Sequence, residues 1–300
     1  MFVQFRDLAN SSVLILLGTH PVPPQLSLVF YPSDMSNIGV FPEAEPLDIG
    51  RISQILGLLG TSWQQVRVLD TVDSTNNEIA RHLQAITPGT PLIVLAEEQT
   101  SGLGRLGRSW SSQHGKGLAL SLGLSIVDAD LTPSSLPLVV GLAVTKVLSE
   151  LAIPAQLKWP NDVVFLNEDG TVRKCGGILV QQTGDYFVIG IGVNITHLVS
   201  ELPTEAATSL FVEGFLIDRN ELAARIINKI EILLSDSTDW VDQYSEVCSS
   251  LGRAVEVVQI SGDDISGTAV RVTGSGSLVL LSDDGEVEIT IGDVRHATID

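Results

Sequence analysis

The chain of 300 residues carries 17 Lys and Arg against 36 Asp and Glu, a formal net charge of −19. Such an acidic chain lacks the basic surface that nucleic-acid backbones and anionic membranes require, so we expect neither as a partner. A hydrophobic fraction of 44% excludes general disorder and allows about two domains with a sizeable core. Cys175 and Cys248 form neither a disulfide framework nor a zinc signature, which favours a reduced, cytoplasmic compartment. No apolar run is long enough to span a bilayer.

The N-terminal stretch contains an apolar run at residues 13–18 that could form the core of a signal peptide. Arg6 ahead of it is balanced by Asp7, and no clear small-residue cleavage site follows, so secretion is the less favoured interpretation. We expect residues 1–34 to contribute little to the fold, either because they are disordered or because translation begins at Met35.

The first strong structural signal lies at residues 73–76, which precede a run with helical spacing at Ile79, Ala80, Leu83 and Ile86. Glu78, three residues after Thr75, predicts a capping box. Residues 92–96 then predict a buried strand. The Gly-, Arg- and Ser-rich stretch 99–116 predicts a loop.

The rest of the chain predicts an α+β fold that ends in a small barrel. Strands are expected at 118–124 and around residues 157, 163–165, 178–180 and 187–189, with hairpin turns at 167–170 and 183–185. Helices are expected at 134–151 and 222–234, the second with Asp218 or Asn220 near its N-cap. From residue 251 onward, short β-rich runs alternate with glycine turns and predict a small all-β domain.

Residues 102–107 read Gly-Leu-Gly-Arg-Leu-Gly and match the fingerprint of dinucleotide-binding folds. That fingerprint needs a crossover helix that begins inside it, whereas the next strand is expected by about Gly117. We therefore exclude a Rossmann site.

The same loop is basic although the protein is acidic, since residues 99–127 contain no Asp or Glu but include Arg105, Arg108 and Lys116. Glycine N–H groups can form an anion nest, arginines bind phosphate through two donors, and Trp110 could stack on a base. A flexible surface loop with solvated arginines explains the composition equally well at this point.

A second polar motif, Lys-Trp-Pro-Asn-Asp, lies at residues 158–162. Lys158, and Lys174 further along, can neutralise phosphate or carboxylate charge. Asp162 follows a proline turn, where it is either a general base or an ordinary turn cap. Trp159 and Cys175 are interpreted as core residues, and the histidines show no metal-binding spacing.

Together, and in this order along the chain, the motifs resemble those of the biotin protein ligases, in their form without a DNA-binding domain. The resemblance covers residues 66–300 and rests on segments 73–76, 96–110, 158–162, 173–179 and 190–194. It implies the class II synthetase-like catalytic fold of biotin and lipoate ligases, with a mixed sheet and helices, and an SH3-like C-terminal barrel. The implied division is an N-terminal extension without a helix-turn-helix at 1–65, a catalytic domain at 66–250 and the SH3-like domain at 251–300.

The resemblance implies a cytoplasmic enzyme that uses biotin, ATP and Mg²⁺. The carboxylate of biotin attacks the α-phosphate of ATP to give biotinyl-5′-AMP and pyrophosphate. A lysine of a partner, the biotin carboxyl carrier protein or domain of a carboxylase such as acetyl-CoA carboxylase, then displaces AMP. The metal ligands and the oligomeric state stay open.

Site residues follow from the matching positions. The implied catalytic residues are Lys174, Arg105 and Asp162, of which Lys174 touches both reacting groups and Asp162 helps to deprotonate the incoming lysine. The implied biotin contacts are Ser74, Thr75, Asn76, Gln99, Gly102, Leu103, Gly104, Arg105, Lys174, Gly190 and Gly192. The implied ATP contacts are Arg105, Arg108, Trp110, Lys158, Asn161, Lys174 and Arg295.

The sequence departs from the family where Leu103 and Leu106 replace common arginines. One alternative is a lipoate–protein ligase type of acyltransferase, but Gln99 and residues 74–76 suit the ureido ring of biotin better than an apolar dithiolane. Another is a biotin sensor or a DNA-binding repressor. The retained cations argue against a sensor, and the acidic residues 1–65 argue against a repressor.

Overall fold

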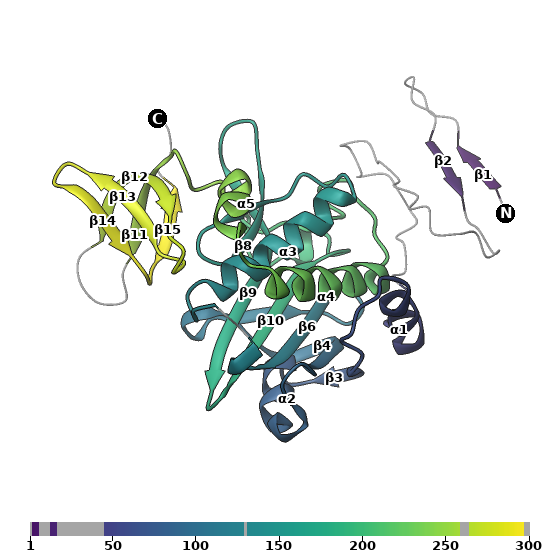
Figure 1. The fold of residues 1–300 in the computed structure, drawn as a ribbon. Coiled ribbons are helices and arrows are strands. Elements are labelled where there is room, and N and C mark those ends of the chain that lie inside the picture. The colour runs from purple at the N-terminus through teal and green to yellow at the C-terminus, as the bar shows by residue number, and fades with distance from the viewer. Residues whose placement is uncertain (1, 6–12, 17–44, 129–130, 259–263, 297–300) are drawn as a thin grey trace.

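The computed structural model describes residues 2–5, 13–16, 45–128, 131–258 and 264–296 (Figure 1). Near the N-terminus, β1 (Phe2–Phe5) and β2 (Val13–Leu16) form an antiparallel ribbon. The other predictions for residues 1–34 lie outside the described residues. None of the helices in the described ranges is long and apolar enough to cross a membrane.

A mixed sheet forms the centre of the fold, with strand order β3-β4-β6-β10-β9-β8-β7 and with β5 paired to β4. β3 and β4 are parallel, and the other neighbouring strands are antiparallel. The strands are β3 (Val66–Val72), β4 (Leu92–Leu103), β5 (Ser109–Ser112), β6 (Gly117–Ser125), β7 (Gln156–Lys158), β8 (Asp162–Leu166), β9 (Val172–Thr183) and β10 (Tyr186–Asn194).

Alternating apolar residues give this sheet two covered faces. Along β4, Ile93 and Leu95 join the large core, whereas Leu92 and Val94 join a smaller cluster on the opposite face. The helices follow this division, because α3 and α4 lie across one face and α2 packs on the other (Figure 1). The helices are α1 (Ile49–Leu58), α2 (Thr75–Arg81), α3 (Leu136–Glu150), α4 (Arg219–Ser235) and α5 (Trp240–Val247).

Most predicted elements are confirmed. The two long predicted helices are α3 and α4, and Asp218 caps α4 by accepting bonds from the amides of Asn220 and Glu221 at 2.8 and 3.1 Å. Both predicted hairpins occur, since β8, β9 and β10 pair in succession. The elements without a sequence prediction are α1, α5, β1, β2, β3 and β5.

The prediction of a loop over residues 99–116 is wrong. β4 continues to Leu103, a short 3₁₀ turn follows at Arg105–Gly107, and β5 folds back so that Gly102 pairs with Trp110. Pairing with a neighbouring strand therefore overrides a composition that is typical of loops. No crossover helix separates β4 from β5, in agreement with the exclusion of a Rossmann site.

A second sheet follows the central one and is antiparallel throughout, in the order β14-β13-β12-β11-β15. It confirms the predicted small β unit and is consistent with an SH3-like domain, although the described strands do not close into a barrel. The indole N–H of Trp159 donates to the carbonyl of Gly276 at 3.0 Å and joins this sheet to the central core. Its strands are β11 (Ala254–Val258), β12 (Ile265–Val272), β13 (Leu278–Ser282), β14 (Gly285–Ile289) and β15 (Asp293–His296).

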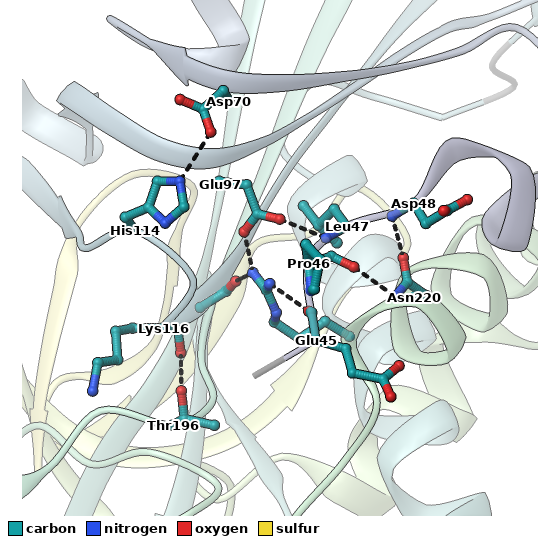
Figure 2. A network of polar contacts seen from close by, with 12 residues as sticks. Glu45, Pro46, Leu47, Asp48, Asp70, Glu97, His114, Lys116, Thr196 and Asn220 are labelled. Carbon is teal, nitrogen blue, oxygen red and sulfur yellow. Dashed lines mark hydrogen bonds and ion pairs between the residues drawn. The ribbon is translucent and has the colours of Figure 1, made fainter. Parts of the chain in front are cut away.

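A buried polar network fixes residues 45–48 to the core (Figure 2). The guanidinium of Arg219, at the start of α4, lies 2.7 Å from the carboxylate of Glu97 on β4, and their side chains are 1% and 6% exposed. Arg219 also donates to the carbonyl of Glu45 at 2.7 Å, and the other carboxylate oxygen of Glu97 accepts from the amide of Leu47. Asn220 accepts from the amide of Asp48 at 2.7 Å. The hydrophobic core accordingly extends to Leu47 and α1. The domain boundaries at 65/66 and 250/251 stay predictions.

Candidate active site

A chain of buried and partly buried hydrogen bonds lies where α2 begins. The side-chain carbonyl of Gln99 on β4 accepts from the amide and hydroxyl of Thr75, at 2.9 and 3.1 Å. The hydroxyl of Ser121 on β6 lies 2.7 Å from the hydroxyl of Thr75 and 2.6 Å from the side-chain oxygen of Asn76. Asn76 in turn donates to Gln181 on β9 at 2.8 Å. Three strands therefore hold the first turn of α2 in one arrangement.

The predicted capping box is wrong. Ser74, not Thr75, is the N-cap residue of α2, and its side chain makes no capping bond. The carboxylate of Glu78 pairs with Arg81 instead, and Gln99 takes the place of a local cap by accepting from the amide of Thr75. A contact from another strand thus replaces the local one.

Residues 74–76 and Gln99 line a small pocket of about 50 Å³, here called the polar pocket. Its floor needs glycine, since a Cβ on Gly190 would lie 2.4 Å from the side-chain oxygen of Asn76. Likewise, a Cβ on Gly192 would lie 2.5 Å from the indole of Trp110. The absence of side chains at these two positions makes room for Asn76 and Trp110.

We expect Gly190→Ala to lower the free energy of unfolding by about 1–3 kcal/mol, because Asn76 must give up its bonds to Ser121 and Gln181 to clear the methyl group. Urea denaturation measures this change. Gly57→Ala is the matched control, because a Cβ there meets nothing within 4 Å and alanine favours the α1 helix by up to about 1 kcal/mol. Equal effects of the two substitutions would contradict the close packing at Gly190.

Lys174 occupies the centre of the site. Its ammonium lies 2.5 Å from the carboxylate of Asp162 on β8 and 5.8 Å from the ring centre of Trp110. Its backbone is held from the other side, where its amide donates to Ala206 at 2.7 Å and its carbonyl accepts from Thr208 at 2.8 Å. Gly176 and Gly177 follow shortly after Lys174. A Cβ on Gly177 would lie 3.2 Å from the end of the Lys174 side chain, so glycine there leaves room for the ammonium group.

Two larger cavities adjoin the polar pocket. The side cavity, of about 320 Å³, extends from Lys174 and Trp110 to Asn194 and His197. The C-terminal cavity, of about 360 Å³, is lined by the loop after β4 and by residues 293–295 of the second sheet. Trp110 and Lys174 line all three spaces and mark the point where they meet.

Lys158 and Asp162 line both larger cavities. Burial lowers the pKa of Lys158, an effect that the nearby carboxylate of Asp162 opposes and the ammonium of Lys174 reinforces. A partly buried cation beside other cations is a favourable place for an added anion.

The two arginines of the 102–108 segment reach toward the second sheet. Arg105 lies 3.1 Å from the carboxylate of Asp293 and donates to the side-chain oxygen of Asn161 at 3.2 Å. Arg108 pairs with the other oxygen of Asp293. One carboxylate therefore holds both guanidinium groups at the edge of the C-terminal cavity, where phosphate oxygens would find the same donors.

The structure brings most of the predicted site residues together. The lining of the polar pocket and of the two cavities includes Ser74, Thr75, Asn76, Gln99, Leu103, Gly104, Arg105, Arg108, Trp110, Lys158, Asn161, Asp162, Lys174, Gly190, Gly192 and Arg295. Arg295 is largely exposed and lies 3.5 Å from Glu256. Gly102 is not among these lining residues and instead allows the close approach of β5, because a Cβ there would lie 2.5 Å from the carbonyl of Trp110.

Several site residues were missed by the sequence reading, among them Ser121, Gln181, Asp293 and His197. Ser121 did leave a signal, as it is a polar residue within the apolar run of β6. The others left no local signal, because only the fold brings Gln181 to Asn76 and Asp293 to Arg105, and only the fold places His197 in the lining of the side cavity.

The chain has relatives among known proteins. The model of the biotin/lipoate A/B protein ligase family matches residues 68–194. The chain is 30% identical to a biotin–[acetyl-CoA-carboxylase] ligase of Mycobacterium tuberculosis over 84% of this chain and 96% of that protein. It is also 30% identical to the bifunctional ligase/repressor BirA of Escherichia coli, over 83% of this chain and 78% of that protein.

Among solved structures, the fold is similar to that of a biotin protein ligase from Aquifex aeolicus in complex with biotin and ATP. The TM-score is 0.68 at 30% identity, and the match covers 78% of this chain and all of the other. A biotin protein ligase from Leishmania major in complex with biotinyl-5-AMP matches with a TM-score of 0.54 at 26% identity, over 76% of this chain and 99% of the other.

Proposed function

Because the chain belongs to the biotin protein ligases of the biotin/lipoate A/B protein ligase family, we propose that it joins biotin to AMP and then to a carrier lysine. The observation that carries the proposal is the position of Lys174. Its side chain lies where the pocket that contains residues 74–76 and Gln99 meets two larger cavities, both of which also contain Lys158. An acid bound on one side and a triphosphate on the other would therefore meet at this ammonium group.

The polar pocket suits the ureido ring of biotin. Thr75, Asn76 and Gln99 offer hydroxyl and amide groups that can both donate and accept hydrogen bonds. Leu103 supplies an apolar wall, and Gly190 and Gly192 leave space for a chain that leads toward Lys174. An apolar dithiolane would make no use of these donors and acceptors, which disfavours lipoate in this pocket.

ATP fits the larger cavities. Arg105, Arg108, Lys158 and Lys174 are positioned to bind the phosphates. The side cavity is lined by the indole of Trp110 and by uncharged groups such as Asn194 and Ala207, so it suits the base. In this placement the α-phosphate lies at Lys174. Asn161 would hold Arg105 in position, and Arg295 would reach the nucleotide from the second sheet.

In the first step, a carboxylate oxygen of biotin attacks the α-phosphorus and pyrophosphate leaves. Two anions must approach each other, and negative charge builds up on the oxygens of the α-phosphate as they do. The ammonium of Lys174 opposes that repulsion and stabilises the transition state, while the arginines hold the leaving pyrophosphate. As Lys174 turns to these anions, its ion pair with Asp162 weakens.

In the second step, the lysine amine of the acceptor attacks the carbonyl carbon of biotinyl-5′-AMP, and AMP leaves with the bonding electron pair. The amine must lose a proton, and Asp162, released from Lys174, would accept it.

The proposed acceptor of biotin is a biotin carboxyl carrier domain of a carboxylase. Incubation with ATP, biotin and such a domain should attach one biotin to one lysine, which mass spectrometry of the carrier domain detects. An unmodified carrier would contradict the transfer step.

Mg²⁺ would neutralise part of the triphosphate charge. Within the described part of the chain, no group of three or more His, Cys, Asp or Glu side chains is placed to hold a metal ion. Mg²⁺ is commonly bound by one or two carboxylates together with substrate phosphates. Asp162 and Asp293, which line the C-terminal cavity beside the cations, fit an ion that arrives with ATP.

Arg105→Gly is expected to retain adenylate formation, because Arg108, Lys158 and Lys174 still bind the phosphates. It should release the adenylate early, since the side chain closes the segment over the cavity by its bonds to Asn161 and Asp293. The measurement is biotin attached to an unrelated protein added to the reaction, which should rise at least about tenfold. Arg271→Gly, which removes an exposed pair with Glu286, is the control. If the unrelated protein gains no extra biotin, Arg105 does not retain the adenylate.

A further inference from the structure

Lys174 lies where the regular pairing of β9 with its neighbouring strands is interrupted. The pairing of β9 with β10 ends at Gly176, two residues after Lys174. On the other side, the pairing with β8 passes from Gly176 to Lys174 and leaves out Cys175, which forms a β-bulge. A bulge disrupts the ladder locally and changes the direction of nearby side chains. The backbone at Lys174 therefore needs support from outside the regular sheet.

The 206–213 segment supplies this support. The amide of Lys174 donates to the carbonyl of Ala206 at 2.7 Å, and the amide of Thr208 donates to the carbonyl of Lys174 at 2.8 Å. Ala207, between them, forms an isolated parallel bridge with Lys174. The segment belongs to no named helix or strand, so its own position depends on further contacts.

Glu213 joins the 206–213 segment to β9 through both of its carboxylate oxygens. One oxygen accepts from the hydroxyl of Thr208 at 2.5 Å, and the other accepts from the guanidinium of Arg173 at 2.9 Å. The side chain of Glu213 is only 11% exposed. Arg173 precedes Lys174 in the chain, and Thr208 binds the carbonyl of Lys174. One carboxylate thus holds β9 and its support together at the residue that carries the ammonium group.

This carboxylate has no direct access to the substrates in the proposed reaction. Neither Arg173 nor Glu213 is among the residues that line the polar pocket, the side cavity or the C-terminal cavity. Any effect of Glu213 on the reaction must therefore pass through the residues that it holds.

We propose that Glu213 is a positioning residue that keeps the ammonium of Lys174 in its reactive position, through Arg173 and Thr208. The inference rests on the proposed function, which brings the biotin carboxylate and the α-phosphate together at Lys174. A displacement of about 1 Å can slow a reaction by about 10²-fold, so a small shift of β9 would matter. Biotin would still bind, because the polar pocket does not depend on this contact.

The test measures biotin-dependent exchange of pyrophosphate into ATP at saturating biotin and ATP. Glu213→Ala should slow exchange about 10- to 100-fold. Glu213→Gln should recover most of the rate, because its oxygen can accept from Arg173 while its amide donates to the hydroxyl oxygen of Thr208. Glu221→Ala, which removes a partly exposed pair with Arg225, is the matched control and should exchange at the natural rate.

The same substitution in the Lys174→Ala chain distinguishes positioning from a general structural role. A residue that acts through Lys174 has no side chain left to position there, so adding Glu213→Ala should change the exchange rate by less than about twofold. A structural role would slow exchange by the same factor in both chains. Titration calorimetry of Glu213→Ala should give a biotin affinity within about twofold of the natural one.

Thr208→Val provides the same comparison if Glu213→Ala does not fold. It removes only the hydroxyl that Glu213 accepts from and keeps the backbone bond to Lys174, so exchange should slow about three- to tenfold. In the Lys174→Ala chain this substitution should also have less than about a twofold effect.

Three results would overturn the inference alone. They are exchange at the natural rate by Glu213→Ala, a rate for Glu213→Gln no higher than that of Glu213→Ala, and an equal loss in the natural and Lys174→Ala chains. A natural chain without biotin-dependent exchange would overturn the proposed function together with the inference.

Discussion

Lys174→Ala is expected to slow biotin-dependent exchange between ATP and pyrophosphate by about 10²- to 10³-fold, the loss typical when one group that stabilises transition-state charge is removed. The fold should persist. The side chain is 37% exposed, and the bonds that hold this part of β9 to Ala206 and Thr208 come from the backbone. The measurement is the exchange rate, with the melting temperature recorded on the same samples.

Two controls sharpen this experiment. Lys229→Ala removes another lysine in an ion pair, with Glu150, and should exchange at the rate of the natural chain. Lys174→Arg retains the charge but replaces a compact ammonium by a planar guanidinium. Its exchange rate should therefore lie between those of Lys174→Ala and Lys229→Ala. Exchange by Lys174→Ala at the natural rate would refute the role of Lys174.

Arg219→Met is expected to lower the free energy of unfolding by about 3–5 kcal/mol, because it leaves the carboxylate of Glu97 buried and without its cation. The substitution also removes the donor to the carbonyl of Glu45, so residues 45–48 lose part of their attachment to α4 (Figure 2). Urea denaturation measures the change.

Matched variants separate the buried charge from loss of the arginine itself. Arg225→Met removes a partly exposed pair with Glu221 on the same helix and should cost no more than about 1 kcal/mol. Adding Glu97→Gln to Arg219→Met removes the uncompensated charge and should restore much of the stability. An equal decrease in the free energy of unfolding for Arg219→Met and Arg225→Met would show that the buried ion pair contributes no more to stability than the partly exposed one.

The parts of the fold that the sequence predicts well are those with local causes. α4 carries helical spacing with Asp218 at its cap, and β6 is a continuous apolar run between turn signals. α1 has the same kind of local cause, because Asp48 caps it and Ile52 and Leu56 have helical spacing, although the predicted elements do not include it. The failures of the loop and of the capping box have a different origin. At both places a partner outside the predicted pattern replaces the expected interaction. β5, within the same 99–116 segment, pairs with β4, and Gln99 accepts from the amide of Thr75, 24 residues away.

The candidate site shows the same division. Lys174 and Arg105 could be proposed as phosphate-binding residues from the sequence, because each lies in a short segment that combines positive charge with glycine. Ser121 and Gln181 act through contacts with residues 45 and 105 positions away, and Asp293 meets Arg105 across 188 positions. Such pairs depend on strand order and on the placement of the second sheet, which no local pattern encodes.

The central claim is that this site activates biotin with ATP, and the exchange of labelled pyrophosphate into ATP tests it most directly. Parallel reactions with Mg²⁺ would contain biotin, lipoate or no acid. We predict exchange that depends on biotin and is absent from the other two reactions. Exchange driven by lipoate, or none with biotin, would contradict the assignment of the polar pocket and of the reaction at Lys174.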